Sequence, residues 1–145
     1  MARWFGVEGR QSSAWEDTLR LTEQAAGEID IHPGQIVLIT GPSGAGKSTL
    51  LAALRTRHAR DWVQVEHVKL RGRSVVDCVG GNLRQRLALM GRVGLGEVWT
   101  YLRAPSELSD GERWHARLAA ALAHAAARDA PMILAADEFA AALDR

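Results

Sequence analysis

The stretch that decides the fold is GPSGAGKST, Gly41 to Thr49. It follows the pattern G-x-x-x-x-G-K-[ST] and lies between an apolar, β-branched run at 35–40 (QIVLIT) and a run of leucines at helical spacing. A loop between a strand and a helix brings backbone amides to the positive end of the helix dipole, where phosphate oxygens bind. We therefore predict a phosphate-binding loop made of Gly41, Pro42, Ser43, Gly44, Ala45, Gly46, Lys47, Ser48 and Thr49.

Two side chains of this loop have distinct predicted roles. Lys47 would span the β- and γ-phosphates of a nucleotide, and the Ser48 hydroxyl would ligate Mg²⁺. The lysine is informative because the chain has 18 basic residues and only Lys47 and Lys69 are lysines. A compact ammonium fits inside a closed loop where a planar guanidinium would not. Thr49 is expected to support the phosphates or the helix.

A second predicted site follows the apolar run at 131–137 (PMILAAD). Asp137 and Glu138 come directly after this run, which we interpret as a buried strand. The carboxyl ends of parallel strands meet at one sheet edge, so both acids are expected beside the phosphate loop. Asp137 would hold Mg²⁺, and Glu138 would orient and deprotonate the attacking water. Alone, the Asp-Glu pair is also typical of a helix start.

The composition places the chain among ordinary folded domains. Its 145 residues fit one domain, 1–145, with 47% hydrophobic and 24% charged residues. No apolar run approaches the roughly 20 residues that cross a bilayer, and the first ten residues lack the apolar stretch of a secretion signal. With Cys78 as the sole cysteine, no internal disulfide can form. We expect a cytoplasmic protein, and the net charge of +1 gives no support for nucleic-acid or membrane binding.

Hydrophobic periodicity predicts an α/β fold. Alternating apolar residues at 19/21 and 29/31 indicate short N-terminal strands, which would form a small antiparallel portion. Helices are predicted from 46 to about 58, around 83–90, around 95–102 and from 112 to 128. Further strands are predicted at 35–40, 63–65, 68–70 and 131–137. Strands that alternate with helices favour a mainly parallel sheet flanked by helices.

The stretch LSDGE, Leu108 to Glu112, opens the last long helix. Ser109 and Glu112 have the S-x-x-E spacing of a capping box, which is the simpler interpretation. A cap does not require Gly111, however. A glycine at this position lets a ligand approach the backbone, and the helix dipole favours an anion there.

At these residues the chain resembles the ATP-binding cassette (ABC) ATPases, a family of P-loop NTPases, from Pro33-Gly34 to its end. GPSGAGKST looks like the Walker A loop, LSDGE like the signature LSGGQ, and ILAADE like Walker B. The later ALD, with Leu143 and Asp144, looks like the D-loop. The resemblance implies a helical subdomain that bears the signature and a dimer closing head to tail on two ATP molecules. In that dimer Ser109, Asp110, Gly111 and Glu112 would face the ATP of the partner, as either a homodimer or a heterodimer.

The chain departs from the family pattern at several positions. Asp110 and Glu112 stand where the signature has glycine and glutamine, so turnover is expected to be slow unless arginines such as Arg113 offset the added charge. Gln85 is a candidate for the glutamine loop, although its surroundings predict a helix. Trp15 and Phe5 are candidates for stacking on the base, and core positions are the simpler interpretation of both. No histidine stands where the switch histidine is expected, so the chain resembles a cassette truncated after the D-loop.

We expect an ABC-type ATPase that binds Mg-ATP, dimerises around it and hydrolyses it, in a non-transport role. The text DEFAAALDR at 137–145, which differs from that of common transporter cassettes, mildly favours this role. The first alternative is the nucleotide-binding subunit of an ABC transporter, which would need a membrane subunit as its partner. The second is an ATP-binding regulatory module without turnover. A chromosome or repair ATPase is a further reading, but no heptad run supports it.

Overall fold

The structure is a computed structural model that describes residues 11–137, with side chains at 16–17 and 19–137. These residues form two compact units, which divide between Ala59 and Arg60 and are described separately below. In the described part of the chain, no helix combines the length and the apolar character needed to cross a membrane.

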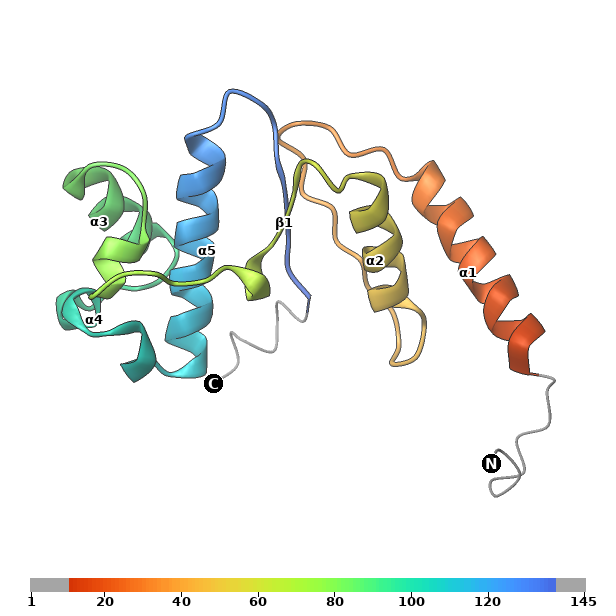
Figure 1. Cartoon of the computed structure of the whole chain (residues 1–145), viewed down its shortest axis with the longest axis horizontal. Helices are drawn as coiled ribbons and strands as arrows, with labels where there is room; N and C mark the ends of the chain where they lie inside the picture. The colour runs from red at the N-terminus through yellow and green to blue at the C-terminus, as the bar shows by residue number, and fades with distance from the viewer. Residues whose placement is uncertain (1–10, 138–145) are drawn as a thin grey trace, which may run out of the picture. The chain divides into compact units, whose positions relative to one another are not determined.

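The first unit is a pair of helices, α1 (Gln11–Glu28) and α2 (Lys47–Arg57), which lie side by side (Figure 1). Ala26 of α1 and Leu54 of α2 are buried. The Arg57 guanidinium donates to the carbonyl oxygens of Ala26 at 2.7 Å and Gly27 at 2.8 Å. The last carbonyls of a helix have no intrahelical donor. The Arg57 guanidinium donates to two such carbonyls of α1 and so links the two helices.

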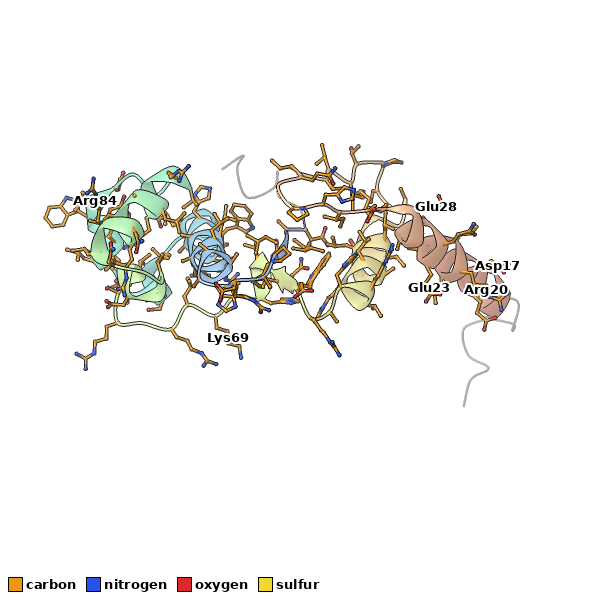
Figure 2. All side chains as sticks on the ribbon, turned by 90° about the horizontal axis from the view of Figure 1, so that it is seen from above. Asp17, Arg20, Glu23, Glu28, Lys69 and Arg84 are labelled. Carbon is orange, nitrogen blue, oxygen red and sulfur yellow. The ribbon has the colours of Figure 1, made fainter. Side chains whose placement is uncertain are left out.

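The prediction of short N-terminal strands was wrong. Residues 19 and 21 lie inside α1, and residues 29 and 31 have no regular structure. Leu19 and Ala26 are seven residues apart, so they share a face of the helix, whereas Leu21 is exposed. The charged side chains Asp17, Arg20, Glu23 and Glu28 are solvent-exposed along α1 (Figure 2).

The strand predicted at 35–40 is also absent from the structure. The turn before it is confirmed: Gly34 has φ 82°, and the amide of Gln35 donates to the carbonyl of His32 at 3.1 Å. Beyond the turn, Ile36 is 99% and Leu38 82% exposed. A strand requires a neighbour that accepts and donates its backbone hydrogen bonds. The single ladder of the described residues joins two other segments, so this run has no such neighbour there.

The second unit contains that ladder. β1 (Trp62–Gln64) and β2 (Ile133–Ala135) pair in parallel, with Trp62 opposite Ile133 and Gln64 opposite Ala135. β2 falls inside the predicted run at 131–137, whereas β1 is shifted by one residue from the predicted run at 63–65. The parallel direction is confirmed. The strand predicted at 68–70 is not present, because the chain turns after β1 through a short 3₁₀ helix, η1 (Val65–His67).

Helices fill the connection between these two strands. In chain order they are η2 (Val75–Cys78), α3 (Leu83–Arg92), α4 (Val98–Leu102), η3 (Pro105–Glu107) and α5 (Asp110–Ala126). The predicted helices at 83–90 and 112–128 are confirmed, and the one at 95–102 begins only at Val98. Cys78 lies in η2, where its thiol donates to the Ser74 carbonyl and burial raises the pKa of the thiol, as suits a packing residue.

Helix α5 is packed on two faces. On one face Ala116, Ala119 and Ala123 join Val75 and Met90 in the larger core of this unit. On another, Trp114 and Ala121 pack with Val65 and with Leu134 of β2. Figure 1 shows α5 between the α3–α4 region and the strand pair. The alanines allow close approach on both sides, because each fills little volume.

Candidate functional site

The predicted phosphate loop is an exposed turn that leads directly into α2. Gly44 and Gly46 have φ values of 79° and 83°, which L-residues with side chains rarely adopt. The first intrahelical bond runs from the amide of Leu50 to the carbonyl of Gly46 at 2.8 Å. The amides of Lys47 and Thr49 precede this bond, at helix positions whose N–H groups have no intrahelical acceptor. The loop therefore presents backbone donors at a helix N-terminus, as phosphate binding requires.

Lys47 lies folded back on this loop. Its ammonium donates to the carbonyl oxygens of Gly41 at 3.0 Å and Pro42 at 2.9 Å. A lysine ammonium has three donors, and here two of them are used by neutral carbonyls. Phosphate oxygens are stronger acceptors than carbonyls because they are charged. The ammonium is thus held over the loop, where the oxygens of a bound phosphate could replace the two carbonyls as its acceptors.

In the second unit, Asp137 follows β2 at the carboxyl edge of the strand pair. Its backbone amide donates to Glu66 Oε1 at 3.1 Å, and the other oxygen of Glu66 accepts from Gln64 Nε2 at 2.8 Å. Asp137 is half-buried. The carboxylate of Glu66 thus holds the backbone of Asp137, the predicted metal ligand, just after the end of β2.

Glu66 was missed in the sequence analysis. The signal that points to it is an acid just after the run at 63–65, at the same edge of the parallel pair as Asp137. Glu138, Leu143, Asp144 and Phe5 lie outside the described residues, and the side chain of Trp15 is not described either.

The turn that opens α5 forms the predicted capping box. The amide of Glu112 donates to Ser109 Oγ at 3.2 Å, and the amide of Ser109 donates to Glu112 Oε2 at 2.8 Å. Ser109 Oγ accepts through a lone pair, and, after the bond from the Ser109 amide, its side-chain hydrogen bond to the Glu112 carboxylate helps to lower the pKa of that carboxyl. The box leaves the amides of Asp110 and Gly111 in the first turn of α5, where the helix dipole favours an anion.

Each of the two extra acids of this turn has an arginine partner. Arg113 Nη1 lies 3.2 Å from Asp110 Oδ1, and Arg103 Nη1 lies 3.3 Å from Glu112 Oε1. Arg113, named from the sequence as an arginine that could offset the added charge, thus contacts one of the two acids. The hydrogen bonds from Ser109, and then the Arg103 charge, hold the pKa of Glu112 below its usual range.

Gln85, the candidate for the glutamine loop, caps α3. Its side-chain oxygen accepts from the amide of Asn82 at 2.9 Å, while its own amide donates to Asn82 Oδ1 at 3.0 Å. Among the residues that the structure describes, no group of three His, Cys, Asp or Glu side chains is arranged to hold a metal ion.

The comparisons with known proteins define the class as a P-loop ATPase domain. A family model described as "AAA ATPase domain" matches residues 16–145, and the chain belongs to that family. Relatives of the ABC kind confirm the resemblance that the three motifs indicated. No solved structure is a significant match.

Three relatives illustrate the range of similarity. A Streptomyces coelicolor protein described as an ABC transporter ATP-binding protein is 32% identical over 76% of this chain and 15% of its own length. The hemin import ATP-binding protein of Pseudomonas putida is 43% identical over 44% of this chain and 26% of its own length. Guanylate kinase of Thermosynechococcus vestitus is 69% identical over 27 residues, 19% of this chain and 14% of the enzyme. The chain thus spans about a quarter or less of these relatives.

The capping box predicts a pH-dependent stability. Replacing Glu112 by glutamine keeps an acceptor for the Ser109 amide but removes the charge facing Arg103. Because the folded pKa of Glu112 is depressed, its charge stabilises the fold above the unfolded value, about 4.3, and this contribution is lost as the pH falls through the folded value. We expect urea unfolding to show Glu112→Gln less stable than the parent by about 0.5–1 kcal/mol at pH 7. The difference in stability between the two proteins should shrink as the pH falls below the unfolded value.

The matched control is Glu97→Gln, which neutralises an exposed acid at the start of α4. It should change stability by less than about 0.5 kcal/mol at either pH. A Glu112→Gln deficit that stays constant between pH 7 and pH 3 would contradict the electrostatic role.

Proposed function

We propose that the chain binds Mg-ATP at the loop 41–49 and hydrolyses it in a site completed by the Ser109 turn of a second copy. The observation that carries the proposal is the turn itself. A capping box holds this turn in place with the amides of Asp110 and Gly111 in the first turn of the helix, while an arginine lies beside each acid. Such a turn can receive a phosphate without further rearrangement.

The loop would hold the triphosphate from the other side. The amides of Gly44, Gly46, Lys47 and Ser48 would contact its oxygens. The Lys47 ammonium would leave the carbonyls of Gly41 and Pro42 for the β- and γ-phosphates. The carbonyls that the ammonium leaves are neutral, whereas the phosphate oxygens that replace them are charged. The exchange of acceptors therefore favours the state with bound nucleotide.

The residues assigned to Mg²⁺ fit a hard cation, because the Ser48 hydroxyl and the Asp137 carboxylate are oxygen donors. When bound, Mg²⁺ would neutralise charge that develops on the phosphate oxygens. Glu66 would keep Asp137 in position through its backbone amide. Glu138 would accept a proton from the attacking water, and the D-loop residues Leu143 and Asp144 would lie at the junction of the two copies, as the ABC resemblance implies.

The leading proposal is a cytoplasmic ATPase without a transport role. A second candidate is the nucleotide-binding subunit of a transporter, which the descriptions of the P. putida and S. coelicolor relatives favour. Stable co-purification with a membrane protein would select this candidate. Binding of ATP without phosphate release would instead indicate a regulatory module.

Replacing Lys47 by alanine tests the loop. The variant loses two charged contacts to phosphate, so we expect ATP affinity, measured by calorimetry, to fall at least about 100-fold. The control Arg55→Ala removes an exposed cation from the same helix and should bind as the parent does. Equal affinity of Lys47→Ala and parent would refute the role of the loop.

Replacing Glu138 by glutamine tests the water-activating role separately from binding. Glutamine preserves the size of the side chain but accepts no proton, so phosphate release should fall about 100-fold or more while ATP remains bound. The control Asp129→Asn changes an exposed acid before β2 and should turn over normally. A Glu138→Gln rate equal to that of the parent would exclude Glu138 as the base.

A further inference from the structure

The second unit contains an open cavity of about 610 Å³, and of its lining residues only Glu66 and Arg113 have a role in the proposed ATP site. It lies between the segment that follows β1, the short helix η3 and one side of α5. Its volume falls within the range of small-molecule pockets, roughly 300–1,000 Å³. The lining residues are Glu66, His67, Val68, Lys69, Leu70, Pro105, Ser106, Arg113 and Arg117.

The charge of this cavity is mainly positive. Lys69, Arg113 and Arg117 supply three cations, against the single carboxylate of Glu66. Both oxygens of that carboxylate already accept hydrogen bonds, one from Gln64 and one from the amide of Asp137. The cavity therefore offers donors to a ligand much more readily than acceptors.

Arg117 is the group that most needs a ligand. Its Nε is buried, and within the described part of the chain nothing accepts a hydrogen bond from it. A buried donor without an acceptor is costly, and a charged one more so. By contrast, Arg113 is satisfied by Asp110 and by the carbonyl of Leu108 at 2.8 Å.

The spacing of the two arginines adds to this demand. They are four residues apart on α5, so their side chains lie on the same face of the helix. Like charges at this spacing repel one another. An anion placed in the cavity beside Arg117 and Lys69 would relieve the repulsion and give the two cations a charged partner.

We propose that this cavity binds the phosphate group of a small phosphorylated molecule. A phosphate has enough oxygens to accept from the Arg117 fork and the Lys69 ammonium together. Val68, Leu70 and Pro105 provide apolar surface for the rest of the molecule. The site shares no residue with the phosphate loop and stands whether or not the chain hydrolyses ATP.

Phenyl phosphate and inorganic phosphate test this site in the Lys47→Ala chain, whose altered phosphate loop competes least. Binding is followed by NMR of the arginine Nε–H groups. We expect the Arg117 signal to shift to saturation, with a dissociation constant of about 1 mM or tighter for phenyl phosphate. Inorganic phosphate should bind more weakly, because it leaves the apolar wall uncovered. Equal affinity for both would leave the phosphate site standing but overturn the apolar part of the proposal.

Three added substitutions locate the binding. Arg117→Gln should weaken phenyl phosphate at least tenfold, and Lys69→Gln, an exposed change with little risk to folding, should weaken it several-fold. The control Arg84→Gln removes a cation of α3 that lies away from Lys69 (Figure 2), and it should have no effect. Saturable binding that Arg117→Gln and Lys69→Gln both leave unchanged would overturn the proposal. So would the absence of binding, or binding of a triglutamate peptide in preference to phenyl phosphate.

Discussion

The double burial of helix α5 is the interaction on which the second unit depends. One side of the helix packs with Val75 and Met90, and another packs with Val65 and the strand β2. Because both sides are covered, α5 cannot shift along either neighbour without opening a cavity, which is costly. Its N-terminal turn, with Ser109 at the cap, is therefore held in a fixed direction by packing that begins at the buried Leu108, the residue before the cap.

This packing links the two chemical features of the unit. The strand against which α5 packs is β2, which ends two residues before Asp137, and Glu66 joins the end of β1 to the amide of that aspartate. The Ser109 turn and the carboxylate edge thus belong to one packed body. In the proposed mechanism they serve different nucleotides, since the turn faces the ATP of a second copy and Asp137 serves the ATP of its own chain.

Local patterns were predictable from the sequence, and pairings between distant segments were not. The glycines and Lys47 define the loop and the start of α2, and the Ser109–Glu112 box is set by residues three apart. The two leucines at 19 and 21 fit either a strand or a helix, and only the packing of α1 on α2 selects the helix. Glu66 acts on a residue 71 positions away, so its role follows from the register of β1 and β2. The run at 35–40 has the composition of a strand, but a strand also needs a partner, and no sequence pattern supplies one.

The central claim is that one ATP is held by the loop of one copy and the Ser109 turn of another. Mixing two inactive variants tests it most directly, with Lys47→Ala and Ser109→Arg each shown by circular dichroism to be folded. In a mixed dimer one site combines both defects and the other combines two intact halves. The account predicts that phosphate release, absent from each variant alone, returns on mixing and is greatest near equal amounts. No recovery at any ratio, with both variants folded, would contradict it.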